Sequence, residues 1–329
     1  MTVRTRSMIR HLLGGALAAL LAIGGGPAGA QDYPSKTIKI ISPSAPGGLT
    51  DIVARLIGER LSQNMKVTVV VENRPGGTGA VALDLVAKAP PDGYTLVVGF
   101  AGANVIYPLL NDKLPFNAQR DFTPITQVSS GGNFLVVHPS VPVHNVKEFI
   151  AYVNAQPKPP TFGSWGNGSG GHLAGEYLKL LTGIKMDHVP YRSNTALATD
   201  LAGGHMLLGF LDATNAIQQQ KAGKVRVLAQ TGPTRATGMP DVPTMLDQGV
   251  KFRVGVWTGI FGPANMPAPV VAKLNAEINR ILLAPDMQEK WLPLFGSTPS
   301  PTTPEEFRKI IADDFTLWRR VIAEGKITL

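Results

Sequence analysis

Two glycine-rich stretches have the residue types of an anion-binding turn. One covers residues 45–51 (APGGLTD) and the other residues 162–172 (FGSWGNGSGGH). Glycine lets the chain curl so that several backbone N–H groups converge. Where a helix begins in such a turn, its first N–H groups have no internal acceptor, and the helix dipole adds about half a positive charge. Each stretch is therefore predicted to bind an anion without a Lys or Arg side chain.

The candidate ligand-binding residues come from these turns and from polar positions further along the chain. Thr50 and Asp51 are candidates to cap the first helix, and Ser169 either caps the second or donates its hydroxyl group to a ligand. Trp165 has few neighbours to pack on within its turn, which favours a position beside a ligand. His172 either bonds to the backbone or donates to the ligand. The complete set is Ala45, Pro46, Gly47, Gly48, Thr50, Asp51, Ser164, Trp165, Gly166, Asn167, Gly168, Ser169, His172, Tyr191 and Asp212.

The second turn also matches the dinucleotide-binding pattern G-x-G-x-x-G, at residues 166–171. That pattern expects an acidic residue about 20 positions later, at the end of the next strand, and Asp187 stands near this place. Export of the chain, argued below, sends it to a compartment where free NAD is not expected. An NAD-dependent enzyme is therefore the weaker alternative, and we expect no cofactor.

Other catalytic patterns are absent from the sequence. It has no Cys, which excludes disulfides, thiolate metal sites and cysteine nucleophiles. It contains no H-E-x-x-H zinc motif, no G-x-S-x-G nucleophile turn and no Walker A motif. It also has no run of Lys or Arg of the kind that binds nucleic acid. We therefore expect no metal, no nucleic-acid partner and no enzymatic activity.

Residues 1–30 have the three parts of a secretory signal peptide. Three arginines precede an apolar run at residues 12–23, and Ala28-Gly29-Ala30 provides a cleavage site. The apolar run is too short to span a membrane. Three of the eight net positive charges lie in this segment, which leaves a net charge of +5 for residues 31–329. We expect residues 1–30 to be removed on export and the mature protein to reside in the periplasm.

The elements that must position the two turns follow from alternating strand and helix patterns. A strand pattern at 37–42 leads into the first turn and a helical stripe at 52–61. A strand pattern around 161–164 leads into the second turn and a helical stripe at 172–181. Such alternation predicts parallel sheets covered by helices, with both turns at the carboxyl ends of strands, where ligands bind.

A series of short motifs runs in order through the chain. They are YPSKTIKI at 33–40, APGGLTD at 45–51, VENRPGG at 71–77, KAPPDGYTL at 88–96, DFTP at 121–124, GSGGHLAGE at 168–176, VPY at 189–191, KAGK at 221–224, PDVPT at 240–244, LNAEI at 274–278 and TPEEF at 303–307. Together they resemble the Bug family (Bordetella uptake gene products), which are extracytoplasmic solute receptors of tripartite tricarboxylate transporters.

The resemblance implies an α/β, two-lobed periplasmic-binding-protein fold of type II-like topology. Each lobe is expected to hold a mostly parallel sheet flanked by helices, with the ligand in the cleft between the lobes. Lobe 1 is expected to comprise residues 31–128 and 249–329, and lobe 2 residues 129–248.

The resemblance also implies the ligand and the partners. The expected ligand is a small carboxylate, namely a di- or tricarboxylate, an amino acid or an aromatic acid, which meets backbone N–H groups of both turns. The expected partners are the membrane subunits of the transporter, and the receptor is expected to be a monomer. A ligand sensor for a two-component system is the alternative output.

The sequence departs from the family pattern at three places. Trp165 stands where members often have Ser or Ala, and Ser193 stands where they usually have Gly. Members commonly have Asp at the positions of Leu207 and Leu211, whereas here only Asp212 is present, one residue later. These changes lie near the expected distal end of the ligand. Trp165 and Leu211 favour a less polar or aromatic acid.

Overall fold

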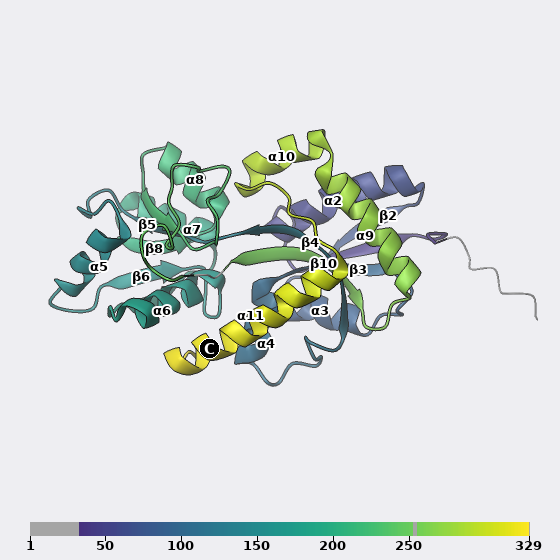
Figure 1. Ribbon diagram of the computed structural model, residues 1–329, viewed down its shortest axis with the longest axis horizontal. Helices are drawn as coiled ribbons and strands as arrows, with labels where there is room; N and C mark the ends of the chain where they lie inside the picture. Colours follow the sequence, from purple (N-terminus) through teal and green to yellow (C-terminus); the bar gives the residue numbers. More distant parts are fainter. Residues whose placement is uncertain (1–32, 253–254, 329) are drawn as a thin grey trace, which may run out of the picture.

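The computed structural model describes residues 33–252 and 255–328, which form two lobes, each built around one five-stranded β-sheet (Figure 1). The predicted signal peptide, residues 1–30, lies outside the described residues. Within the described ranges, no helix combines the length and the hydrophobicity that a membrane span requires.

The sheet of lobe 1 contains β1 and the strands that join the two lobes. Its strand order is β2 (Val69–Asn73), β1 (Ile38–Ser42), β3 (Thr95–Phe100), β10 (Val256–Pro263) and β4 (Phe122–Gly131). One face is covered by α2 (Leu49–Met65), α9 (Ala268–Leu283) and α10 (Pro285–Phe295). The other is covered by α3 (Ala80–Ala87) and α11 (Pro304–Gly325), with the short segments η1 (Gly77–Gly79), η2 (Gly102–Ile106) and α4 (Tyr107–Leu110) nearby.

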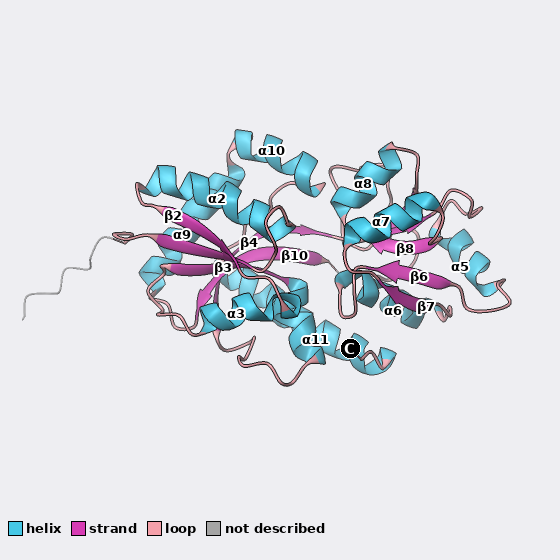
Figure 2. Ribbon diagram, turned by 180° about the vertical axis from the view of Figure 1, so that it is seen from behind, coloured by secondary structure: helices cyan, strands magenta, loops and turns pink. Residues whose placement is uncertain are grey.

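The sheet of lobe 2 is assembled in the same way (Figure 2). Its strand order is β7 (Asp187–Pro190), β6 (Thr161–Ser164), β8 (Leu208–Leu211), β5 (Phe134–Val137) and β9 (Arg226–Gln230). Helices α5 (Val146–Asn154) and α6 (Gly170–Thr182) pack on one face. Helices α7 (Asn194–Gly203) and α8 (Ala213–Lys221) pack on the other.

The apolar strands supply the core because both of their faces are covered. Successive residues of a strand point to opposite faces, so Ile40 packs on the α2 side of the lobe 1 sheet and Ile41 on the α3 side. One core cluster continues from lobe 1 into lobe 2. Helix α11 contributes Phe307, Phe315 and Trp318 to this cluster, and it therefore packs against both lobes.

The expectation of mostly parallel sheets requires a correction. In each sheet two strand pairings are parallel and two are antiparallel. The reason is the path of the chain, because β4 leads out of lobe 1 and β10 leads back, so these neighbouring strands run in opposite directions. The predicted change of lobe at residue 129 falls within β4, and the predicted return at residue 249 precedes β10.

Candidate ligand-binding site

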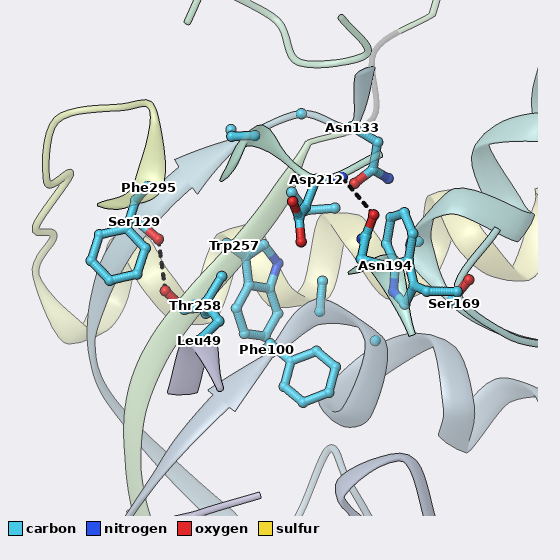
Figure 3. Close-up of a pocket in the computed structure, with 18 of the residues that line it drawn as sticks. Leu49, Phe100, Ser129, Asn133, Ser169, Asn194, Asp212, Trp257, Thr258 and Phe295 are labelled. Carbon is cyan, nitrogen blue, oxygen red and sulfur yellow. Dashed lines mark hydrogen bonds between the residues drawn. The ribbon is translucent and has the colours of Figure 1, made fainter. Parts of the chain in front are cut away.

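A cavity of about 570 Å³ lies between the two lobes (Figure 3). This is a common size for a small-molecule site. Lobe 1 supplies Ser44, Leu49, Thr50, Thr78, Phe100, Ala101, Gly102, Ile106, Val256, Trp257, Thr258, Phe295, Gly296 and Ser297. Lobe 2 supplies Trp165, Asn167, Gly168, Ser169, Gly170, Asn194, Asp212, Ala213 and Ala236. Residues 129–134, where β4 leads into β5, also line the cavity and are called the crossing segment. The cavity is therefore lined by both lobes and by the chain that joins them.

The first glycine-rich turn leads from β1 into α2. Gly48 is the N-cap of α2, and no side chain caps this helix. The prediction that Thr50 or Asp51 caps it was wrong, because the helix begins at Leu49 and both residues already lie within its first turn. The first N–H groups of α2 have no acceptor within the helix and Gly48 offers none from a side chain. Leu49 and Thr50 line the cavity, so the N-terminus of α2 lies at its wall.

Asp51 instead holds the shape of the first turn. Its carboxylate accepts hydrogen bonds from the backbone N–H of Gly47 at 2.8 Å and from Asn73 Nδ2 at 2.7 Å. It also forms an ion pair with Arg55 at 2.9 Å. Burial alone would raise the pKa of Asp51, but the hydrogen bonds from Arg55, Gly47 and Asn73 outweigh burial and lower it. Asp51 is therefore ionised at neutral pH and clamps the turn from behind.

Small polar groups and a close backbone approach complete the first turn. The hydroxyl group of Thr50 contacts Ser42 Oγ at 3.0 Å and Ser44 Oγ at 2.6 Å. A Cβ atom on Gly48 would lie 2.6 Å from the Cβ of Ser44, which no relaxed structure allows. Gly47 has a φ of +80°, in the region that favours glycine. Both glycines are thus required by the geometry of the turn.

The second glycine-rich turn leads from β6 into α6 and faces the same cavity. Ser169 caps α6, because its Oγ accepts a hydrogen bond from the backbone N–H of His172 at 3.2 Å. The buried Ser164 Oγ accepts from Gly166 N at 3.3 Å and contacts His188 Nε2 at 2.6 Å. Gly170 lines the cavity at the first position of α6. The two turns therefore bring two helix N-termini to one cavity, one from each lobe.

A stacked pair of histidines supports the second turn. His172 and His188 have ring centroids 3.9 Å apart, and His172 Nδ1 accepts a hydrogen bond from the backbone N–H of Gly168 at 3.1 Å. Burial lowers the pKa of His172. Burial, followed by the effect of His172, lowers the pKa of His188 to about 3. Both rings are therefore neutral at pH 7, and His172 bonds to the backbone of the turn rather than lining the cavity.

Asp212 and Trp165 shape the lobe 2 side of the cavity. Asp212 follows β8 and caps α8, because its Oδ1 accepts from the backbone N–H of Asn215 at 2.8 Å. Its backbone N–H donates to Asn194 Oδ1 at 3.3 Å, and Figure 3 shows the carboxylate directed into the cavity. Burial raises the pKa of Asp212, against the opposite effect of the hydrogen bonds from Asn215. The ring of Trp165 packs against Gly171 and also lines the cavity.

The predicted site residues fall into three groups. Those that line the cavity are Thr50, Trp165, Asn167, Gly168, Ser169 and Asp212. Those that lie in or behind the two turns without lining it are Ala45, Pro46, Gly47, Gly48, Asp51, Ser164, Gly166 and His172. Tyr191 also lies outside the cavity lining, and its hydroxyl group donates to Asp200 at 2.9 Å. A direct contact with a ligand stays a prediction for every member of the set.

The sequence analysis did not identify the crossing segment as part of the site, nor most of the aromatic residues that line the cavity, namely Phe100, Phe134, Trp257 and Phe295. The segment Ser129-Ser130-Gly131-Gly132-Asn133 lines the cavity, and its run of small polar residues, which ends β4 and leads into β5, was the available signal. Trp257 lies on β10 with 5% of its surface exposed, and its Nε1 donates to Asp314 at 2.6 Å. Burial raises the pKa of Asp314 to about 6. Nothing in an apolar strand pattern distinguishes a cavity wall from the core.

The strand register does not support the dinucleotide alternative. Asp187 pairs with Thr161 at the amino end of β7, whereas the glycine turn follows Ser164, which pairs with Pro190. Three strand residues, or about 10 Å, separate Asp187 from the edge where a ribose would lie. The predicted position at the strand end was therefore wrong. Among the residues that the structure describes, no cluster of three or more His, Asp or Glu side chains has the arrangement of a metal site.

Comparison with known proteins identifies the family. Residues 53–327 match the family model described as the tripartite tricarboxylate transporter family receptor. The chain belongs to this receptor family. Protein BugT of Bordetella pertussis is 31% identical over 300 residues, which cover 91% of this chain and 92% of BugT. The resemblance to the Bug family is thereby confirmed, and the family is one of solute receptors rather than a class of enzymes.

Solved structures with the same fold are similar over nearly the whole described chain. A structure described as a periplasmic transporter is 36% identical, with a TM-score of 0.79, and the match covers 90% of this chain and 99% of that one. A Rhodopseudomonas palustris protein with adipate is 29% identical, with a TM-score of 0.80 and coverages of 90% and 99%. MatC from Rhodopseudomonas palustris with bound malate is 30% identical, with a TM-score of 0.76 and coverages of 88% and 100%. The predicted two-lobed fold of periplasmic binding proteins is confirmed.

Proposed function

We propose that this receptor captures a small carboxylate in the periplasm and delivers it, as a monomer, to the membrane subunits of a tripartite tricarboxylate transporter. The observation that carries the proposal is the meeting of two helix N-termini at one cavity. Helix α2 begins at Leu49 in lobe 1, and α6 begins at Gly170 in lobe 2, and both residues line the cavity. Each turn alone would bind an anion weakly, and together they can bind it from two sides.

The physical basis is the backbone rather than charged side chains. Each N–H group in the first turn of a helix is a donor without an internal acceptor, and the dipole adds positive potential there. A hydrogen bond to a charged group contributes about 1.5–3 kcal/mol. A few such bonds, less the cost of association, are consistent with a dissociation constant near micromolar, or about −8 kcal/mol. The apolar wall that includes Phe100 and Trp257 excludes water and strengthens them.

The ligands of two relatives support a carboxylate. One solved structure is described with adipate and another with bound malate, and both ligands are small dicarboxylates. This chain has two such turns and a cavity between its lobes. We therefore propose the same chemical class for one end of its ligand.

The crossing segment is the hinge on which the lobes close over the ligand. Gly131 ends β4 and Gly132 follows it before β5, and a Cβ atom on Gly132 would lie 2.2 Å from the backbone nitrogen of Gly232. Gly255 approaches the same point, because its Cβ would lie 3.3 Å from the carbonyl oxygen of Gly131. Hinges are short segments that absorb changes of φ and ψ. Closure presents a joint surface of both lobes to the membrane subunits.

Calorimetric titration of the exported protein against mono-, di- and tricarboxylates tests the proposal. We expect heat release with at least one carboxylate at micromolar to sub-millimolar affinity. The amides and alcohols of the same carbon skeletons are the matched controls, and we expect them to bind at least tenfold more weakly. Binding of uncharged solutes with silence across every carboxylate would contradict the anion site. Loss of uptake of the same carboxylate on deletion of the receptor gene tests the transport role.

A further inference from the structure

Asp212 is the only ionisable side chain among the described residues that line the cavity. The other polar side chains in that lining are neutral hydroxyl, amide and indole groups. One carboxylate oxygen of Asp212, Oδ1, accepts hydrogen bonds from the backbone N–H and from Nδ2 of Asn215. Figure 3 shows the carboxylate group at the cavity, above the rings of Trp257 and Phe100. Any bound solute therefore meets a single acidic group.

Asp212 lies close to the anion-binding turn of the same lobe. It directly follows β8, which is parallel to β6, so both strands end at the same edge of the sheet. Neighbouring strands are about 4.8 Å apart. A carboxylate at the N-terminus of α6 therefore leaves the remainder of a small ligand within a few bonds of Asp212.

This proximity discriminates between ligands that carry a carboxylate at one end. Burial raises the pKa of Asp212, so a second carboxylate or an alkyl end beside it further disfavours its ionised form. An ammonium group pairs with Asp212 and provides hydrogen-bond donors to the oxygen that Asn215 does not hold. The aromatic rings of Phe100, Trp257 and Phe295 lie around the cavity and accept an apolar or aromatic linker.

We infer that this receptor selects a zwitterion, in which a carboxylate binds at the N-termini of α2 and α6 and an ammonium group binds to Asp212. The inference rests on the proposed function, because it assigns the distal end of a ligand whose proximal end is the carboxylate. It makes Asp212 the residue that determines specificity, and it places amino acids ahead of dicarboxylates among the ligands of this chain.

Matched sets of three ligands test the inference by calorimetry. Each set keeps one carboxylate and varies only the other end between methyl, ammonium and carboxylate. The sets are butyrate, 3-aminopropionate and succinate; pentanoate, 4-aminobutyrate and glutarate; and 4-ethylbenzoate, 4-(aminomethyl)benzoate and 4-(carboxymethyl)benzoate. The common α-amino acids are titrated beside their deaminated counterparts. We expect the best ligand to be a zwitterion that binds at least tenfold more tightly than its methyl and carboxylate analogues.

Two variants separate the charge of Asp212 from its structural role. Asp212→Asn keeps an oxygen that caps α8, since Asn is as good a cap as Asp, but removes the negative charge. We expect its melting temperature to lie within a few degrees of that of the wild type. We expect the ratio of its affinities for the zwitterion and for the methyl analogue to fall at least tenfold. Asp187→Asn removes the same charge from an exposed position at the far end of β7 and should leave the preference unchanged.

The outcomes separate this inference from the proposed function. Preference for a dicarboxylate or a methyl analogue, or a zwitterion preference that survives in Asp212→Asn, overturns the inference and leaves the carboxylate receptor standing. Silence of the wild type with every set contradicts the proposed function itself, and the inference falls with it.

Discussion

Replacement of Gly171 by Ala tests the packing that sets the position of Trp165. A Cβ atom at residue 171 would lie 2.5, 2.9 and 3.1 Å from three atoms of the Trp165 ring, and these are its three nearest neighbours. Because carbon atoms pack at about 3.5–4.0 Å, the ring must move by about 1 Å. Such overpacking costs about 1–3 kcal/mol.

The same substitution is favourable for the helix itself. Ala in place of Gly within a helix contributes about 0.5–1 kcal/mol, and residue 171 is the second residue of α6. Gly171→Ala should therefore lower the free energy of unfolding by about 1 kcal/mol in the wild type. With Trp165→Ala already present, the same change should raise it by about 0.5–1 kcal/mol. The sign reversal corresponds to a coupling energy of about 1–3 kcal/mol between the two residues.

Urea denaturation of the wild type, both single variants and the double variant measures this cycle without any ligand. Intrinsic fluorescence is unsuitable as the sole probe, because the Trp165→Ala variant and the double variant both lack Trp165. Far-UV circular dichroism therefore provides the matched readout. Equal effects of Gly171→Ala in both backgrounds would refute the contact with Trp165 as the reason that residue 171 is glycine.

Three further predictions concern ionisable groups that hold the site. Asp51→Asn should lower the free energy of unfolding by about 1.5–3 kcal/mol at pH 7, because it weakens charge-assisted hydrogen bonds from Arg55 and Gly47. Since the pKa of Asp51 in the folded protein lies below 3.8, the difference in stability from the wild type should shrink as pH falls below that value. The same difference in urea denaturation at pH 7 and at pH 3 would contradict this. His188 has a pKa of about 3 in the folded protein against 6.5 when unfolded, so the stability that its neutral ring contributes is complete above pH 6.5 and is lost as pH falls. The wild type should therefore lose about 1–2 kcal/mol more of its free energy of unfolding between pH 7 and pH 5 than His188→Gln does. Identical pH slopes for the two proteins would exclude this effect. Burial raises the pKa of Asp314 to about 6, so the stability that its protonated form contributes is complete below pH 3.8 and is lost as pH rises through 6. Asp314→Asn keeps an acceptor for Trp257 and should be more stable than the wild type by about 1 kcal/mol at pH 8 but not at pH 4. A variant less stable at both pH values would show that the buried charge of Asp314 does not destabilise the wild type.

The two turns were predictable because their chemistry is local. A strand, a glycine-rich stretch and a helical stripe follow one another within about a dozen residues, and the structure places a helix N-terminus directly after each stretch. Ser169 caps α6 as the sequence indicated. The first cap is Gly48, two residues before Thr50 and three before Asp51. Asp51 finds its partners in Arg55 and Asn73 instead, and Asn73 lies on β2.

Features that depend on strand register, or on which strand brings the chain back to lobe 1, could not be predicted from the sequence. Asp187 lies near the expected position in sequence but at the wrong end of β7, which only its pairing with Thr161 reveals. Trp257 follows an apolar pattern that is equally typical of a core residue, yet its ring lines the cavity because β10 crosses between the lobes. The antiparallel pairings of β10 have the same origin, since no local pattern records which strand brings the chain back.

The most direct measurement is a crystal structure of the protein with the carboxylate that gives the strongest calorimetric response. We predict that the carboxylate oxygens lie about 2.7–3.1 Å from backbone nitrogens in the first turns of both α2 and α6. A ligand whose carboxylate contacts neither helix N-terminus, or contacts one lobe alone with the lobes closed, would contradict the two-sided anion site.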